Sequence, residues 1–253
     1  MPGTSERDAP VADTHRPGYA AVIGDLVGSR QAAAGLFDHV TAALTRVNDR
    51  IEALQPLQIT IGDEFQGVYR GLGAALDATL LVRLLLHGTA DVRFGIGWGG
   101  FTRWNPDRAP FEQDGPAWWA AREALDAARA QESGAGLPVG WRTAVRFDPA
   151  LPVPAAGAPP AADAATETRV PAAPRPLDLH LPSVLDAVVM FRDHLCARLD
   201  DRDVALVLAV LDGATVTDAA QQVGISQQAA SRRLRTNGGY ALLQSWRQFQ
   251  EDT

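Results

Sequence analysis

The sequence has 253 residues, enough for one large domain or two small ones, and its 46% hydrophobic and 21% charged residues are ordinary for a globular protein. All 23 basic residues are arginine. The absence of lysine excludes Walker-type phosphate loops and Schiff-base enzymes, because both need that residue. The net charge of −7 argues against a protein that coats nucleic acid along its whole surface, although it leaves room for a local basic face.

The use of cysteine favours a reducing compartment, and the lack of long apolar runs argues against a membrane span. Cys196 is the single cysteine, so no internal disulfide and no cysteine-based zinc site can form. No apolar run approaches the roughly 20 residues that cross a bilayer. Residues 1–17 are polar, contain proline and lack the apolar core of a signal peptide. We therefore expect a cytoplasmic protein with a disordered N-terminal arm and no membrane contact.

The first half of the chain alternates between strand and helix patterns, and we expect it to form one domain over residues 18–147. In chain order the expected elements are a strand at 19–24, a helix at 36–54, strands at 57–61 and 65–69, a helix at 73–87 and a strand at 92–98. This β-α-β-β-α-β order is typical of the ferredoxin-like fold, an α+β architecture. A further helix at 115–131 and an edge strand at 141–147 follow.

Two acidic positions stand where strands of this domain meet turns. Asp25 ends the first strand in GDLVGSR, and Asp63 lies beside Glu64 in the turn of ITIGDEFQG. These strands are neighbours in the expected topology, so Asp25 and Asp63 should converge and suit a hard cation such as Mg²⁺ or Mn²⁺. The backbone amides just past Asp25 could cradle phosphate oxygens. The simpler alternative is that each Gly-Asp pair is an ordinary turn.

Residues 19–131 resemble the SatD family through the segments IGDLVGSR and ITIGDEFQG, and the resemblance extends through VRFGIGWGG (92–100) and DGPAWWAAREAL (114–125). That family is in turn similar to the class III nucleotidyl cyclases and the GGDEF cyclases. The resemblance implies that Asp25 and Asp63 hold metal ions around a nucleotide. It places the backbone of Leu26, Val27, Gly28 and Ser29 at the phosphate loop. We expect further ligand contacts at Arg30, Glu64, Trp118 and Arg122.

The sequence departs from the class III pattern at positions that serve catalysis. Arg122 matches an arginine that stabilises the transition state in those cyclases, but Trp118 stands where they have asparagine. The lysine that selects purines is replaced by Ile59 or Thr60. Because catalysis needs contacts that are stronger in the transition state than in the ground state, we assign no catalytic residue. Nucleotide binding could persist without these contacts.

Trp118 and Arg122 also have structural interpretations. Trp118 and Trp119 are adjacent, so one should pack in the core while the other faces elsewhere. Trp118 is either a platform for base stacking or a core residue. Arg122 could instead pair with Glu123 or Asp126 on a solvated face of its helix.

The second half of the chain begins after a proline-rich and alanine-rich segment. Residues 148–182 show no sustained apolar periodicity, so we expect a flexible linker between two separately folding units. Residues 183–253 should then form a small all-α domain. Within it, a helix at 203–211 precedes the segment 217–236, whose spacing is typical of a helix-turn-helix.

The helix-turn-helix interpretation assigns a role to each part of this segment. Thr217 should cap the first helix, Gly224 should make the turn, Ile225 should pack between the helices, and Ser226 should cap the second helix. The apolar positions expected to face inward are Ala219, Ala220, Val223, Ala230 and Leu234. The predicted DNA contacts are Ser226, Gln227, Gln228, Ser231, Arg232, Arg233 and Arg235. Glutamine can pair with adenine edges, and arginine with guanine edges or phosphate. The alternative is a helical packing or dimerisation bundle without DNA contact.

Two classes of function follow. The leading hypothesis is a homodimeric, DNA-binding transcriptional regulator whose degenerate cyclase-like domain senses a nucleotide with a divalent metal. The alternative is an active metal-dependent nucleotidyl cyclase, or another phosphoryl-transfer enzyme, with an accessory helix-turn-helix. A third hypothesis, an acid-stress accessory protein without a ligand, rests only on the family's name.

Overall fold

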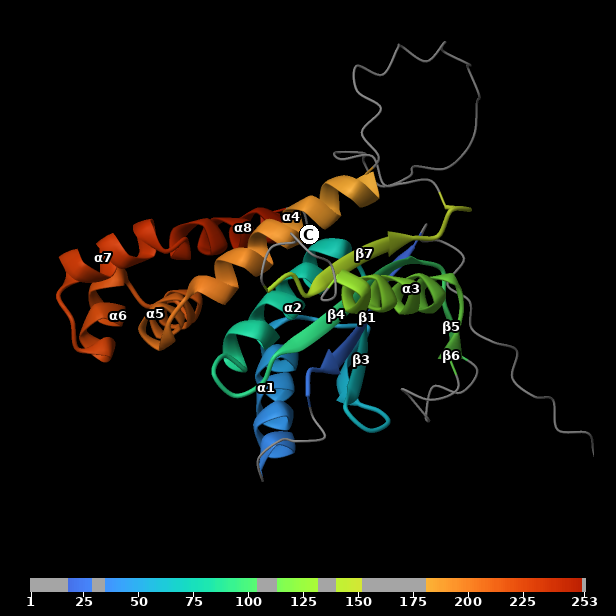
Figure 1. Ribbon diagram of the computed structural model, residues 1–253, viewed down its shortest axis with the longest axis horizontal. Coiled ribbons are helices and arrows are strands. Elements are labelled where there is room, and N and C mark those ends of the chain that lie inside the picture. Colours follow the sequence, from blue (N-terminus) through green and yellow to red (C-terminus); the bar gives the residue numbers. More distant parts are fainter. Residues whose placement is uncertain (1–17, 29–34, 104–112, 132–139, 152–180, 252–253) are drawn as a thin grey trace, which may run out of the picture.

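The computed structural model describes residues 18–28, 35–103, 113–131, 140–151 and 181–251. The predicted arm at 1–17 and most of the predicted linker, 152–180, lie outside these ranges. Figure 1 shows a sheet with helices on both faces and a group of C-terminal helices against one side of it. No described helix combines the length and the apolar character that a membrane crossing requires.

The elements between Tyr19 and Phe147 are here called the first unit. A five-stranded mixed sheet forms its centre, in the order β2-β3-β1-β4-β7. Its strands are β1 (Tyr19–Leu26), β2 (Gln55–Ile59), β3 (Glu64–Tyr69), β4 (Val92–Gly99) and β7 (Thr143–Phe147). Neighbouring strands among β1, β2, β3 and β4 are antiparallel, whereas β7 runs parallel to β4. All eight residues of β1 are buried, which fits its place in the middle of the sheet. A separate two-stranded ribbon pairs β5 (Thr102–Arg103) with β6 (Gln113–Asp114).

This arrangement confirms the predicted α+β class and the predicted β-α-β-β-α-β succession. Several boundaries differ from the prediction, those of the second strand and the first helix among them. The second strand begins at Gln55, two residues early. The first helix ends at Arg50, because Ile51 adopts extended backbone angles. The strand predicted at 141–147 does lie at an edge of the sheet, as β7.

Helices cover both faces of the sheet (Figure 1). They are α1 (Leu36–Arg50), α2 (Leu72–Leu85) and α3 (Pro116–Gln131). Residues of α1 and α2 share an apolar cluster with Ala20 and Val22 of β1. Residues of α3 form a second cluster with Tyr19, Ala21 and Ile23, which alternate with the first set along the strand and face the opposite side.

Glycines on β4 allow α3 to lie directly on the strand backbone. A Cβ atom at Gly95 would overlap the carbonyl oxygen of Ala121, and one at Gly97 would overlap that of Ala117. The two glycines are two residues apart and therefore face the same side of the sheet. This close approach places the rest of α3 over the ends of β1 and β3.

A helix that we did not predict, α4 (Leu181–Arg198), docks on the first unit. Asp186 accepts a hydrogen bond from the backbone N–H of Val145 in β7 (2.8 Å). Arg192 is buried and donates to the carbonyl oxygen of Leu76 in α2 (2.7 Å). Apolar residues occur around much of this helix, so it lacks the one-sided pattern of an ordinary surface helix.

The remaining helices also contact the first unit. They are α5 (Asp201–Leu211), α6 (Val216–Val223), α7 (Gln227–Thr236) and α8 (Gly239–Glu251). The larger apolar cluster runs from the sheet through α1 and α2 into α5 and α8. Arg46 and Arg50 of α1 form ion pairs with Asp212, and Arg50 also lies over the ring of Trp246. The two halves of the chain thus share one apolar core.

Candidate functional site

The two acidic motifs meet at one end of the sheet, with a different pairing from the one predicted. The residue opposite Asp25 of β1 is Glu64 of β3. Asp63 precedes β3, in the turn, and its carbonyl oxygen accepts a hydrogen bond from the Leu26 N–H (3.2 Å). The predicted convergence of the two strand ends is therefore correct, but Glu64 rather than Asp63 stands across from Asp25. The reason is that β3 begins one residue later than Asp63.

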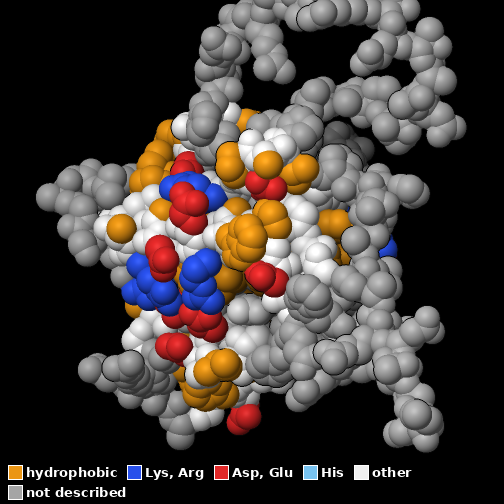
Figure 2. Space-filling view, turned by 90° about the vertical axis from the view of Figure 1, so that its right-hand side faces the viewer, with side chains coloured by type: hydrophobic (Ala, Val, Ile, Leu, Met, Phe, Trp, Pro, Cys, Tyr) orange, Lys and Arg blue, Asp and Glu red, His pale blue; other side chains and the backbone are white. Residues whose placement is uncertain are grey.

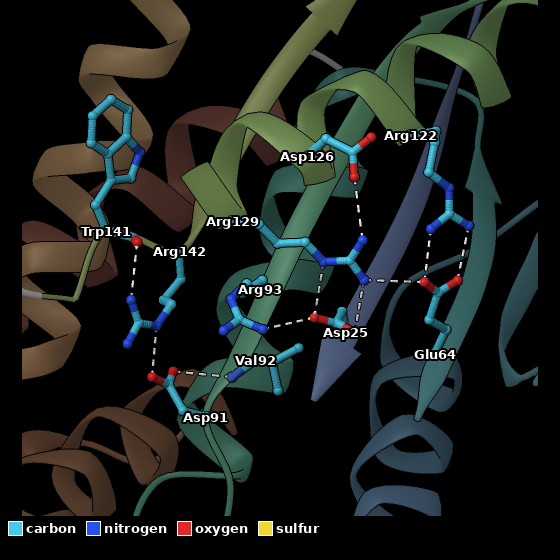
Figure 3. A network of polar contacts seen from close by, with 10 residues as sticks. All are labelled: Asp25, Glu64, Asp91, Val92, Arg93, Arg122, Asp126, Arg129, Trp141 and Arg142. Carbon is cyan, nitrogen blue, oxygen red and sulfur yellow. Dashed lines mark hydrogen bonds and ion pairs between the residues drawn. The ribbon is translucent and has the colours of Figure 1, made fainter. Parts of the chain in front are cut away.

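Asp25 is buried and bound by two arginines (Figure 3). Arg93, its neighbour on β4, donates from Nη1 to Oδ2 (2.8 Å). Arg129 of α3 donates from Nη2 to Oδ1 (3.0 Å) and from Nε to Oδ2 (3.4 Å). The hydrogen bond to Asp25 is the largest cause of a raised pKa of Arg129. Both oxygens of the Asp25 carboxylate are thus occupied by guanidinium groups.

Glu64 is held in a similar way. Arg122 forms a bidentate pair with it, Nη1 to Oε1 (2.7 Å) and Nη2 to Oε2 (2.9 Å). Arg129 adds a third contact, Nη2 to Oε1 (3.3 Å), and so bridges Asp25 and Glu64. The Arg122 hydrogen bond, with the charges of both arginines, lowers the pKa of Glu64 against the opposing effect of burial. We call these five residues, Asp25, Glu64, Arg93, Arg122 and Arg129, the sheet-end cluster.

Sequence reasoning missed two members of this cluster and misjudged a third. Arg122 pairs with Glu64, and not with Glu123 or Asp126 as the structural alternative suggested. Arg129 lies two turns after Arg122 on the same side of α3, a spacing that the sequence does contain. Nothing in the sequence marked Arg93 except its position in a predicted strand. With arginine as the sole basic residue type, neither Arg93 nor Arg129 stood out.

The carboxylates of Asp25 and Glu64, as they are arranged here, do not form a site that suits a divalent cation. A metal ion between Asp25 and Glu64 would lie against Arg129, whose guanidinium binds both carboxylates. Like charges at that distance repel, so the arginine would first have to leave. Among the described residues, no group of three or more His, Cys, Asp and Glu is placed to hold a metal ion.

Two backbone N–H groups of the predicted phosphate loop are already hydrogen-bonded within the protein. The backbone N–H of Val27 donates to the carbonyl oxygen of Asp91 (2.9 Å), so it does not face a ligand. Leu26 is buried, and its N–H is bonded to the Asp63 carbonyl oxygen. Gly28 is exposed, with a positive φ of 72°. Ser29 and Arg30 lie outside the described residues.

The two adjacent tryptophans separate as predicted. Trp118 is 9% exposed and packs in the cluster beneath α3, whereas Trp119 is 62% exposed. The core interpretation of Trp118 is thereby confirmed. Next to both rings is an open pocket of about 480 Å³. We call it the tryptophan pocket; its lining residues are Ile23, Gln66, Gln113, Trp118, Trp119 and Arg122. Because Arg122 belongs to both, the pocket adjoins the sheet-end cluster.

Figure 2 shows the side of the molecule on which β5 and β6 lie in Figure 1. Basic and acidic side chains are grouped together on this face, and apolar side chains border them. Where described side chains are visible on this face, opposite charges therefore lie next to each other.

The second candidate site is the pair α6 and α7. Gly224 ends α6 with a φ of 71°, a conformation that glycine adopts without strain. Ser226 caps α7 by accepting a hydrogen bond from the Ala229 N–H (3.2 Å), as predicted. The cap of α6 is Thr215 and not Thr217, because Asp218 lies three residues after Thr215 and completes a capping box.

Burial along α6 and α7 follows most of the predicted inward and outward positions. Ala230 and Leu234 are buried. The residues predicted to face outward and found exposed are Ser226, Gln227, Gln228, Arg232 and Arg235; Ser231 is half-buried. Ala219 and Ala220 are buried too, and Val223 and Ile225 are partly buried against the same cluster.

Arg233 is the exception among the predicted DNA contacts. Its Nε donates to Asp203 of α5 (2.8 Å), and its Nη2 pairs with Asp200. The hydrogen bond to Asp200, followed by that to Asp203, raises the pKa of Arg233. The residue lies one turn after the buried Ala230, at the edge of the inward side of α7, which explains why it binds α5. Asn237 also donates to Asp203 (2.8 Å).

Comparison with known proteins confirms the resemblance predicted for the first half of the chain. Residues 19–136 match the SatD family, which covers slightly less than half of the chain. The adenylyl cyclase CyaB from P. aeruginosa is similar at 17% identity and a TM-score of 0.34, over 44% of this chain and 71% of that chain. A guanylyl cyclase domain from the aquatic fungus Blastocladiella emersonii is similar at 15% identity and a TM-score of 0.33, over 42% of this chain and 72% of that one. A bacterial light-regulated adenylyl cyclase is similar at 15% identity and a TM-score of 0.38, over 51% and 74%. No curated protein matches the sequence.

Proposed function

We propose that this chain, whose residues 19–136 fall in the SatD family, is a DNA-binding transcriptional regulator that responds to a nucleotide. The observation that carries the proposal is the outer face of α7. Gln227, Gln228, Arg232 and Arg235 are exposed on a capped helix that follows α6 through a tight glycine turn. These side chains suit the major groove, where glutamine reads adenine and arginine reads guanine or binds phosphate.

The attachment of α7 supports this role, because a recognition helix has to be held at a fixed angle. Arg233 and Asn237 tie it to the buried carboxylate of Asp203 at the start of α5. Ala230 and Leu234 pack the same side of α7 into the helical core. The inward side of the helix is therefore anchored, and its outer side is left for a partner.

The contact between the two halves supports regulation by a ligand. The first unit touches the helical region through Arg46 and Arg50, which pair with Asp212 just after α5. A ligand that shifts the sheet or α1 could thus bias the position of α5 and, through Asp203, of α7. Such coupling requires that the ligand binds the two arrangements with different affinity.

The enzyme hypothesis is weaker on the same geometry. A metal-dependent phosphoryl transfer would need free carboxylates at Asp25 and its neighbour. Asp25 and Glu64 instead bind Arg93, Arg122 and Arg129. Because the carboxylates are already bound to arginines, the geometry favours nucleotide binding over catalytic phosphoryl transfer.

Selection of a preferred sequence from random DNA, followed by titration with the full chain, tests the proposal. We expect Gln228→Ala to weaken binding to the selected sequence by about 1–3 kcal/mol, the scale of one good base contact. Gln244→Ala, at an exposed position of α8, serves as the matched control and should leave affinity unchanged. A full chain that binds no DNA at low salt would refute the proposal.

The same titration addresses the proposed homodimer. A single recognition helix makes few contacts, and the acidic chain repels phosphate, so useful affinity should need two half-sites. Moving the two halves of the selected sequence apart by five base pairs, half a helical turn, should abolish tight binding. Unchanged affinity would indicate that one copy suffices.

A further inference from the structure

We infer that the tryptophan pocket binds the base of a nucleotide, with the phosphate bound by arginine and not by a metal ion. This inference rests on the proposed nucleotide response and identifies the place and chemistry of that ligand. It differs from the expectation drawn from the cyclase resemblance, which centred the ligand on metal ions at Asp25 and Asp63. The pocket volume of about 480 Å³ is within the range of small-molecule sites.

Trp119 supplies the first part of the argument. Its ring is 62% exposed although it is the largest kind of apolar side chain. It is also fixed, because its Nε1 donates to Asp114 Oδ1 (2.7 Å), and the same oxygen accepts from the Gly115 N–H (2.8 Å). With its single donor already bonded, the indole offers a partner only its flat aromatic surface. A planar heteroaromatic ring is the ligand that such a surface stacks on.

Polar groups around the ring match the edge of a base. Gln66 lies on the same face of β3 as Glu64, because alternate residues of a strand point to the same side, and Gln113 comes from β6. A side-chain amide carries both donors and an acceptor, as the edges of nucleobases do. Both glutamines line the pocket. The Gln66 amide can therefore select among bases.

Trp118 forms the inner wall of the pocket. The side chain lines the pocket and is nine-tenths buried in the apolar cluster beneath α3. Its indole Nε1 is closed to solvent, so it offers a ligand no accessible donor. Trp118 thus shapes the pocket, and Trp119 supplies the exposed aromatic surface.

Arg122 defines the charged part of the ligand. It uses one N–H of each terminal nitrogen for Glu64, and a guanidinium has five. Its side chain is 42% exposed at the pocket, and Arg129 lies beside it, bonded to the same carboxylate. An anionic group can therefore join the arginines from the solvent side. One phosphate suits this site, because a triphosphate would bring more negative charge next to Asp25 and Glu64.

Calorimetric titration of the full chain in excess chelator tests the inference. The probes are AMP, GMP, cyclic AMP and cyclic GMP, with ribose 5-phosphate as the probe that lacks a base. At least one of the four should bind and ribose 5-phosphate should not. Trp119→Ala should weaken that binding at least about fivefold, the lower end of the range for one stacked base. Trp119→Phe should keep most of it, and Gln66→Ala should change the preference among bases.

Phe191→Ala is the matched control, because Phe191 is an aromatic residue on α4 with a similar exposure of 64%. It should leave nucleotide affinity unchanged. Failure of all four probes to bind, binding that appears only with added Mg²⁺, or equal affinity in the wild type and Trp119→Ala would overturn the inference. DNA titrations of the same preparations separate the two proposals. Nucleotide binding without DNA binding refutes the regulator and leaves the pocket, and the reverse result refutes the pocket alone.

Discussion

Two groups of arginine–carboxylate pairs in this molecule have the same chemistry and different surroundings. In the helical region, Arg233 binds Asp200 and Asp203 and fixes α7 against α5. In the sheet-end cluster, Arg129 joins residues of β1 and β3 to α3 next to an open pocket. The first pairing holds a surface in position, and the second borders a place where a ligand can compete for its arginines. Arginine pairing alone therefore does not tell a structural contact from a binding site.

Lifting α3 from the sheet should destabilise the sheet-end cluster most strongly. In Gly97→Ala the new methyl group would overlap the backbone of Ala117, so we expect a loss of about 3 kcal/mol in the free energy of unfolding, at the upper end for overpacking. Urea denaturation measures this loss. Gly100→Ala is the control, because a Cβ atom there meets no neighbouring atom. Equal stability of the two variants would show that α3 tolerates a shift.

The helical region should respond next most strongly. Asp203→Ala removes a carboxylate that is 2% exposed and accepts hydrogen bonds from Arg233 and Asn237. We expect a loss of about 2 kcal/mol in unfolding free energy, because hydrogen bonds to charged groups contribute most. Asp201→Ala, at an exposed carboxylate of the same helix end, should cost less than about 1 kcal/mol. If both losses are the same, Asp203 does not anchor α7.

A third variant examines the cluster without unfolding the protein. Arg129→Met removes the guanidinium that bridges Asp25 and Glu64 and leaves the two carboxylates side by side. We expect Mn²⁺ to bind this variant with a dissociation constant of roughly millimolar order, whereas the wild type should show no heat of binding. Calorimetry makes the comparison, and Arg146→Met, on β7, is the control. Tight Mn²⁺ binding by the wild type would restore the metal hypothesis.

The smallest expected effect is on pH dependence. Contacts with Arg122 and Arg129 hold the pKa of Glu64 below its ordinary value of 4.5. A lowered pKa in the folded state means that the stabilisation is fully present above pH 4.5 and is lost as the pH falls through the folded-state pKa. Solvent screening around the half-exposed Arg122 keeps the effect modest. The urea midpoints of wild type and Glu64→Gln should therefore differ at pH 7 and converge as the pH falls through the folded-state pKa of Glu64. Glu52→Gln, at an exposed position, should show no such convergence.

Features that depend on neighbouring residues, such as helix caps and turns, were predicted more often than contacts between residues far apart in the sequence. Ser226 and Gly224 were found because a cap and a turn depend on residues within four positions. Thr215 was missed although the same kind of signal was present, since Asp218 completes its capping box three residues later. Asp25 was identified from the end of its strand. Its partners Arg93 and Arg129 are 68 and 104 residues away, and only the register of β4 and the glycine-dependent position of α3 bring them together.

The edges of the sheet limit how two copies of this chain can meet. On β7, Asp186 takes the Val145 N–H that an added strand would use. On β2, Pro56 has no N–H to offer. Strand addition is thus hindered at both margins, which protects the sheet from edge-to-edge aggregation. Two copies would then associate through other surfaces, so the distance between two α7 helices would not be set by a continuous sheet.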